Sequence, residues 1–454
     1  MKNLKKVLSL VLALAMALSL MTVAFAADAS DFKDYDEVKY NEAVDVMVAT
    51  GVFNGVEGNN FAPETTLTRE MAAKIITYMM MGQKEADKLT TTVAPYADVA
   101  AGRWSAGAIA WCTEQGILTG YNGKFNPTGK LTGLAFAKMC LVAMGYDAKI
   151  EKLEGNSWAI NSATLAIQSN LDDDMEEVSL SKVLTREEAA QMAFNTMKAD
   201  LVRYANKGTN ITLSDGSQVV IGATPATVYD DGEYGVSNDN NLGGDNAQFA
   251  EKYCKDLKLD SSNPDTYKRP GHTWTFDGDE INTYADAPVA TFTKATDADD
   301  VAAALKGYVL VNNQNTPNND ADDVTYKVNN TTKYSNSTAF TDATSGKIFH
   351  VTNYQGTESD SNVAANAANQ TVAERLAAST KNGRLVEVYA NSDKEITDIV
   401  CVGYAVTQVN KITTNKAGDV KYQFEGLSAL NNYADADKTD DLKIVGEIAE
   451  DAFV

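Results

Sequence analysis

The residues best suited to binding chemistry are two arginines set in the same short pattern. Leu67-Thr68-Arg69-Glu70 and Leu184-Thr185-Arg186-Glu187 share one tetrapeptide. A planar guanidinium can hold a carboxylate by two parallel hydrogen bonds, and an adjacent helix N-terminus adds amide donors and a positive dipole. Each arginine is therefore a candidate contact for an anionic ligand. The alternative is that each arginine pairs with a nearby glutamate on a solvated face.

Each tetrapeptide places its threonine where a helix would begin. Thr68 and Thr185 precede strongly apolar stretches, and so does Thr132. A threonine hydroxyl at an N-cap accepts a hydrogen bond from a backbone amide of the first turn. Glu188, three residues after Thr185, supplies the reciprocal half of a capping box. The sequence therefore predicts three helices, each beginning at one of these threonines.

These threonines close three copies of one longer unit. Each copy carries an aromatic residue before its first helix (Tyr40, Trp104 or Trp158), and its threonine follows 28, 28 and 27 residues later. Apolar residues at helical spacing after the aromatic predict an amphipathic first helix. Because one helix–loop–helix unit cannot bury two apolar faces alone, the three units should pack together.

Turn residues connect the two helices of a unit. Gly51 and Gly116 lie where the first helix must stop, as expected of a left-handed C′ residue. Gly55 and Gly120, four residues further on, would let the chain reverse in a tight turn. The first two units also share an aromatic-x-Asp start and a Phe-x-Pro segment, as Phe32-Lys33-Asp34 with Phe61-Ala62-Pro63 and Tyr96-Ala97-Asp98 with Phe125-Asn126-Pro127.

Residues 30–200 as a whole resemble three tandem S-layer homology domains, modules that attach surface-layer proteins and surface enzymes to Gram-positive-type cell walls. The resemblance rests on the aromatic-x-Asp, Gly-x-x-x-Gly, Phe-x-Pro and Leu-Thr-Arg-Glu elements at these spacings. It implies an all-α pseudo-trimer of helix–loop–helix repeats at residues 27–88, 89–150 and 151–205, the last one degenerate. It also implies that grooves between repeats bind secondary cell-wall polysaccharide, often pyruvylated, without covalent linkage.

The resemblance assigns binding residues by position. The family's Thr-Arg-Ala-Glu motif falls on Thr68-Arg69-Glu70-Met71 and Thr185-Arg186-Glu187-Glu188, so these threonines and arginines would meet the ketal carboxylate. A glycine in the groove turn would admit the sugar or serve only the backbone. A tryptophan would stack on a sugar ring or pack in the core, and an aspartate would touch the ligand or cap a turn. The residues concerned are Gly55 and Gly120, Trp104 and Trp158, and Asp34 and Asp98.

The later units depart from the motif. Gly133 stands in the second unit where the arginine is expected, so that groove lacks a guanidinium. The third unit lacks the aromatic-x-Asp start and the glycine pair, and carries Asp172-Asp173-Asp174 in that region. We therefore expect a competent groove at Arg69, a weaker one at Arg186, and a third interface that is structural.

The first residues are typical of a secretory signal. Lysines at positions 2, 5 and 6 precede an apolar run, and Ala24-Phe25-Ala26 supplies a cleavage pattern, so residues 1–26 are predicted to be removed. A membrane anchor is the alternative, but the run is short for a bilayer span. We therefore predict a secreted protein at the cell wall or S-layer of a Gram-positive-type bacterium, without a transmembrane anchor after cleavage.

Charge and composition limit the partners. The net charge of −23 should repel nucleic acid and anionic lipid headgroups. Acidic residues between Asp239 and Glu251, and at Asp320, Asp322 and Asp323, lack EF-hand spacing, so we expect no cofactor beyond loosely bound calcium. Cys112 and Cys140 lie in apolar helical patterns and fit small core residues better than disulfides.

Residues 206–454 are predicted to be a β-rich, sandwich-like region of one or two modules, which makes the whole chain α+β and multidomain. Alternation around Asp215-Gly216, and Thr273-Trp274-Thr275-Phe276 before Asp277-Gly278, predict hairpins. Short helices are expected near residues 301–305 and 372–376, and further strands between 385 and 424.

The patterns together predict a non-enzymatic envelope protein whose repeats bind wall polymer and whose β-rich region is displayed or self-associates in a surface lattice. Nucleophile, zincin and Walker motifs do not occur, and His272 and His350 are the only histidines. The alternatives are a wall-anchored carbohydrate-active enzyme or a glycan-binding adhesin, with its site in residues 206–454. Paired carboxylates in an aromatic-lined cleft would favour the enzyme.

Overall fold

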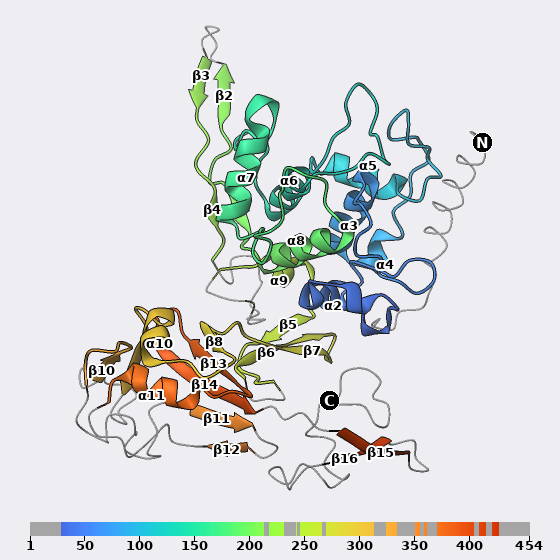
Figure 1. Ribbon diagram of the computed structural model, residues 1–454. Coiled ribbons are helices and arrows are strands. Elements are labelled where there is room, and N and C mark those ends of the chain that lie inside the picture. The colour runs from blue at the N-terminus through green and yellow to red at the C-terminus, as the bar shows by residue number, and fades with distance from the viewer. Residues whose placement is uncertain are drawn as a thin grey trace. The chain divides into compact units, whose positions relative to one another are not determined.

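The fold is given by a computed structural model, drawn in Figure 1. The structure describes residues 29–212, 218–230, 242, 246–265, 269–312, 324–333, 350–354, 358–360, 370–403, 408–414 and 420–425. The chain divides into two compact units. The first extends to Ser261 and includes Thr273–Asn282, and the second holds Ser262–His272 and the chain from Thr283 onward. We predicted that the repeat region ends near residue 205, and the unit that contains it takes in these further segments.

Helices dominate the first unit, and three consecutive pairs of them match the predicted helix–loop–helix units. We call these pairs the first, second and third helical units: α2 (Asn41–Ala49) with α3 (Arg69–Met81), α5 (Ala106–Glu114) with α6 (Gly133–Met144), and α7 (Trp158–Gln168) with α8 (Arg186–Lys198). Shorter pieces flank them: η1 (Ala29–Asp31), η2 (Tyr35–Glu37), α4 (Gln83–Ala86), η3 (Gly155–Ser157) and α9 (Phe249–Tyr253).

The helix boundaries follow the capping chemistry expected from the sequence. Thr68, Thr132 and Thr185 are the N-caps of α3, α6 and α8, and the side chain of each accepts a hydrogen bond from a backbone amide of the first turn. Thr185 and Glu188 form the predicted capping box. The hydroxyl oxygens of the two candidate ligand threonines are therefore already engaged by their own helices.

The first helix of each unit ends on a left-handed residue. Gly51 and Gly116 both have φ of +72°, as predicted for C′ positions. In the third unit Asn170, with φ of +55°, follows the C-cap of α7 and takes the place of the missing glycine. Asparagine tolerates this conformation better than most residues, so the third unit keeps the turn without the glycine.

Three leucines join the helical units around a ring. The Leu67 amide donates to the Leu184 carbonyl at 2.9 Å, Leu131 donates to Leu67 at 3.0 Å, and Leu184 donates to Leu131 at 3.1 Å. All three side chains are buried. Because each leucine immediately precedes an N-cap threonine, this ring places the N-termini of α3, α6 and α8 at successive interfaces between units.

Small β-elements complete the first unit. They are the pairs β1 (Val202–Arg203) with β4 (Thr227–Val228) and β2 (Thr209–Thr212) with β3 (Gln218–Ile221). A three-stranded sheet follows, of β5 (Leu257–Asp260), β6 (Gly271–Phe276) and β7 (Asp279–Ala285), of which residues 257–260, 273–276 and 279–282 belong to the first unit. Both predicted hairpins are present. Asp277 and Gly278, with φ of +53° and +90°, connect β6 to β7 in the two-residue turn that the sequence predicts. The Asp215-Gly216 turn lies outside the described residues.

Trp274, on β6, is buried within the first unit. Its ring meets the Phe194 ring of α8 edge-on, with centroids 5.3 Å apart, and its Nε1 donates to Glu42 of α2 at 2.7 Å. The side chain is 1% exposed. One tryptophan from outside the repeat region thus contacts both the first and the third helical units.

The second unit is built on a five-stranded sheet in the order β12-β11-β14-β13-β8, in which β11 and β14 are parallel and the other pairs antiparallel. Helices α10 and α11 pack together and, with strands of the sheet, enclose a core that includes Val301, Leu376 and Ile399 (Figure 1). Leu310 and Tyr326, from the separate two-stranded sheet of β9 and β10, belong to the same core, so two helices and a small second sheet complete it where the sequence predicted a sandwich-like region. The elements are β8 (Ala290–Phe292), α10 (Ala298–Ala304), β9 (Val309–Asn312), β10 (Val324–Lys327), β11 (His350–Tyr354), β12 (Glu358–Asp360), α11 (Val372–Ser379), β13 (Arg384–Ala390), β14 (Ile396–Gly403), β15 (Gln408–Thr414) and β16 (Val420–Glu425).

Other sequence predictions concern cysteines, membrane spans, metal ligands and the signal segment. Cys112 and Cys140 are free and buried, as expected of core residues. Among the described residues, none of the helices is long and apolar enough to cross a membrane, and His, Cys, Asp and Glu form no group of three suited to a metal ion. The predicted signal segment 1–26 and the acidic residues Asp320, Asp322 and Asp323 lie outside the described residues.

Candidate functional site

Arg69, the first residue of α3, reaches across the interface into the second helical unit. Its Nε donates to the Phe125 carbonyl at 2.9 Å and its Nη2 to the Thr119 carbonyl at 3.0 Å. The guanidinium carbon lies 4.6 Å from the centroid of the Phe125 ring. Burial lowers the pKa of Arg69 below its ordinary value, but the group remains a cation at neutral pH. The side chain stays partly exposed at this interface.

Arg186 makes the equivalent contacts between the third and first helical units, but it is buried. Its Nε donates to the Phe61 carbonyl at 2.9 Å, and its Nη2 donates to the Asn54 carbonyl. The guanidinium carbon lies 5.2 Å and 4.9 Å from the ring centroids of Phe53 and Phe61. The residue is 8% exposed, and burial lowers its pKa to about 10. Arg186 is therefore much less accessible than Arg69.

The remaining interface, between the second and third helical units, has no arginine and no room for one. The Gly133 amide donates to Lys182 at 3.0 Å, and the Leu134 amide donates to Leu180 at 2.7 Å. A Cβ added at Gly133 would lie 2.8 Å from the Cα atom of Leu180. The glycine that replaces the motif arginine thus permits direct backbone contact between these units.

Two glutamates next to the arginines make further contacts across the interfaces, and sequence reasoning did not identify them. The Glu70 carboxylate accepts hydrogen bonds of 2.6 Å from Arg103 Nε, Arg103 Nη2 and Ser105 Oγ. At the equivalent interface, Glu187 accepts a hydrogen bond from the Lys39 backbone amide at 2.9 Å. Burial raises the pKa of Glu187. The sequence did carry a signal for these glutamates, because both occupy the motif position at which the family has alanine.

The two candidate aspartates support the backbone. Asp34 accepts from the Phe61 and Ala62 amides at 2.7 Å each, and Asp98 accepts from Phe125 at 2.8 Å and Asn126 at 2.7 Å. The central residues of the two Phe-x-Pro segments have φ of +60°, so these carboxylates stabilise a left-handed conformation. The backbone hydrogen bonds lower the pKa of Asp98.

Gly55 and Gly120, the candidate glycines, each lie against an aromatic ring that leaves no room for a side chain. A Cβ on Gly55 would lie 2.6 Å from the Phe32 ring, and one on Gly120 would lie 2.3 Å from the Tyr96 ring. Neither glycine has a positive φ, so the reason differs from the turn conformation that we predicted. These glycines let the aromatic of the aromatic-x-Asp element pack against the loop.

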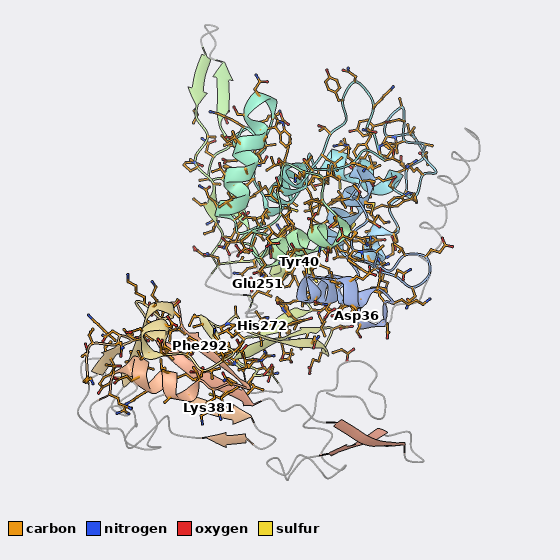
Figure 2. All side chains as sticks on the ribbon, viewed as in Figure 1. Asp36, Tyr40, Glu251, His272, Phe292 and Lys381 are labelled. Atoms are coloured by element: carbon orange, nitrogen blue, oxygen red, sulfur yellow. The ribbon has the colours of Figure 1, made fainter. Side chains whose placement is uncertain are left out.

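The aromatic residues that open the three units lie at or just before the first turns of α2, α5 and α7. Tyr40, labelled in Figure 2, is the N-cap of α2, Trp104 precedes α5, and Trp158 begins α7. All three are partly exposed rather than buried. None of the three is therefore a fully buried core residue.

The chain carries two segments, residues 31–73 and 95–137, that match the family model of the S-layer homology domain. These segments cover most of the first and second helical units, including the Arg69 interface. The third helical unit lies outside both segments.

Similar proteins are surface proteins of bacteria. The chain is 25% identical over 214 residues to a surface layer protein of Brevibacillus choshinensis, which covers 47% of this chain and 18% of that protein. It is 29% identical over 147 residues to a cell surface protein of Thermoanaerobacter kivui, covering 32% of this chain and 19% of that protein. A surface-layer 125 kDa protein of Lysinibacillus sphaericus is 27% identical over 225 residues, covering 45% of this chain and 18% of that protein.

The chain spans less than a fifth of the length of these relatives. The matched domains and the relatives place the protein outside the cell, at the cell wall or S-layer, as the sequence predicted.

Proposed function

We propose that the first unit anchors the protein to the cell wall by non-covalent binding of a secondary wall polysaccharide in the groove at Arg69. The observation that carries this proposal is the position of Arg69. It is a partly exposed guanidinium at the N-terminus of α3, fixed across the interface by the carbonyls of Thr119 and Phe125. A cation that its own fold has already oriented binds an anionic ligand with little further loss of conformational entropy.

The kind of ligand follows from the Arg69 nitrogen that the protein's own carbonyls leave available. Arg69 Nε and Nη2 donate to protein carbonyls, whereas Nη1 makes no hydrogen bond with any residue in the described part of the chain. A carboxylate, such as that of a pyruvate ketal on the polymer, would be held through Nη1. Partly exposed Trp104, in the same unit as Thr119, supplies a ring on which a sugar can stack.

The three helical units together form a pseudo-trimer in this proposal, with the third as a degenerate repeat. The ring of hydrogen bonds between Leu67, Leu131 and Leu184 supports this arrangement. The Thr-capped helices and the equivalent contacts of Arg69 and Arg186 support it as well.

The Arg186 groove contributes less to anion binding than the Arg69 groove. Arg186 is buried against two phenylalanine rings. Burial and then the negative charges of Glu188 and Glu187 raise the pKa of the nearby Tyr40 phenol, so this groove carries acidic side chains. Negative charge near this groove repels an anionic ligand.

The second unit is, in this proposal, displayed at the cell surface as part of a non-catalytic envelope or surface-layer structure. The support is that the relatives are surface-layer and cell surface proteins. Self-association in a surface lattice belongs to the same proposal.

The test is a binding assay with the mature chain, residues 27–454, on purified sacculi. Sacculi that retain their secondary polymer are compared with sacculi stripped of it by hydrofluoric acid. We expect polymer-dependent binding that Arg69→Ala abolishes, whereas Lys88→Ala, which removes an exposed cation of the same unit, leaves it intact. Equal binding to both kinds of sacculi would contradict the proposal.

A further inference from the structure

Glu70 binds the residues on both sides of Trp104. Two of its hydrogen bonds come from Arg103, immediately before the tryptophan, and the third comes from Ser105, immediately after it. All three are 2.6 Å long. A single carboxylate in the first helical unit therefore fixes the backbone that carries Trp104 in the second.

The pair between Glu70 and Arg103 is rigid. Glu70 is 5% exposed, and both Arg103 nitrogens contact its carboxylate in the bidentate geometry that limits rotation of a guanidinium. Ser105 is fully buried. Because this network is largely shielded from water, it holds one conformation better than an exposed pair would.

The other interfaces supply an internal comparison. Glu187 accepts from the Lys39 backbone amide, so a carboxylate also contacts the residue immediately before Tyr40, the equivalent aromatic of the first helical unit. Leu134 occupies the glutamate position in the second helical unit and has no carboxylate to place Trp158. The glutamate therefore occurs at the two interfaces that also contain an arginine, and is missing where the arginine is missing.

We propose that Glu70, acting through Arg103 and Ser105, is a positioning residue that sets Trp104 to stack on a sugar ring while Arg69 binds the carboxylate of the same ligand. Arg69 thus binds the ligand directly, and the neighbouring Glu70 positions Trp104, which is the second ligand contact. This inference rests on the proposed wall-polymer binding.

A double-mutant cycle on polymer-bearing sacculi tests it. Glu70→Gln keeps the shape of the side chain but removes the charge that holds Arg103. We expect Glu70→Gln to weaken binding about tenfold, and Trp104→Ala to weaken it about thirtyfold, the loss that removal of a well-placed tryptophan gives. If Glu70 acts through Trp104, the double variant should bind no more weakly than Trp104→Ala alone.

Controls separate this inference from the proposed function and from misfolding. Glu114→Gln removes an exposed charge from α5 and should bind as the parent chain does. Arg103→Lys keeps the charge but loses the bidentate contact. It should bind polymer more weakly while its thermal unfolding midpoint stays that of the parent chain. If Glu70→Gln binds normally while Arg69→Ala loses binding, the inference is overturned but the proposed function stands. The same conclusion follows if the losses of Glu70→Gln and Trp104→Ala add in the double variant. No polymer dependence in the parent chain would overturn the proposed function, and the inference with it.

Discussion

At the scale of single residues, Arg69 and Arg186 show how one tetrapeptide meets two environments. Both arginines donate to two carbonyls of the neighbouring unit, so both join units together. Arg186 is packed against Phe53 and Phe61, while Arg69 contacts Phe125 and keeps exposed surface. A substitution at either arginine therefore affects stability, and only at Arg69 do we expect a large additional loss of ligand binding.

Asp98 gives a prediction of pH dependence at this scale. Because backbone amides lower its pKa, its contribution to stability is present above the ordinary aspartate value of about 4 and is lost as pH falls through the lower, folded-state pKa. Asp98→Asn should therefore lower the thermal unfolding midpoint at about pH 7, and this difference from the parent chain should shrink toward about pH 3. Scanning calorimetry at both pH values measures it, and exposed Asp36→Asn serves as the control. A difference that grows on acidification would be inconsistent with the role assigned to Asp98.

At the scale of elements, the β6–β7 hairpin is part of the structure that holds α2 and α8. Trp274 packs on Phe194 and donates to Glu42, and Asn282 on β7 donates to Asp45 of α2 at 3.4 Å. These contacts bridge the first and third helical units, whose interface contains Arg186. The hairpin therefore stabilises an interface between repeats, although its own sequence is not part of a repeat.

Trp274→Ala should reduce the free energy of unfolding by about 3–5 kcal/mol, because it removes a fully buried tryptophan and leaves a cavity. Urea unfolding of the parent chain and the variant measures the difference. Trp274→Phe keeps the aromatic contact with Phe194 and loses the hydrogen bond to Glu42, so its loss should be nearer about 1–2 kcal/mol. Equal stability of Trp274→Ala and the parent chain would show that the hairpin is not part of the fold of the first unit.

At the scale of the whole molecule, the chain leaves the first unit at Ser261, returns to it for Thr273–Asn282, and then continues in the second unit. The first unit therefore depends on segments well beyond its repeats. Phe249, Leu257 and Trp274 are all buried in it, at 0%, 0% and 1% exposure. Without them the surfaces of α8 and α2 that they cover would face water.

A fragment of residues 27–205 should consequently be less stable than one of residues 27–282. We expect the shorter fragment to unfold at lower temperature and to be cleaved faster by a nonspecific protease, because apolar surface of α8 is exposed in it. Circular dichroism melting and limited proteolysis compare the two. Matching melting curves would mean that the repeats alone form the stable unit.

The sequence by itself determined what depends on neighbouring residues. Threonine caps, glycines at helix ends, the capping box at Thr185 and the Asp-Gly hairpin turn follow from local backbone chemistry, and all were predicted correctly. The repeat and its arginines were visible because equivalent positions carry equivalent residues at nearly constant spacing.

Tertiary structure decided what depends on contacts between distant segments. The carbonyls that accept from Arg69 lie 50 and 56 residues away in the chain. The side chains that donate to Glu70 lie 33 and 35 residues away, and Trp274 donates to Glu42 across 232 residues. No periodic pattern encodes such pairs, because a hydrogen bond between distant residues requires only that the fold bring them together. The unequal exposure of Arg69 and Arg186, from which the choice of groove follows, was likewise fixed by packing against the neighbouring unit.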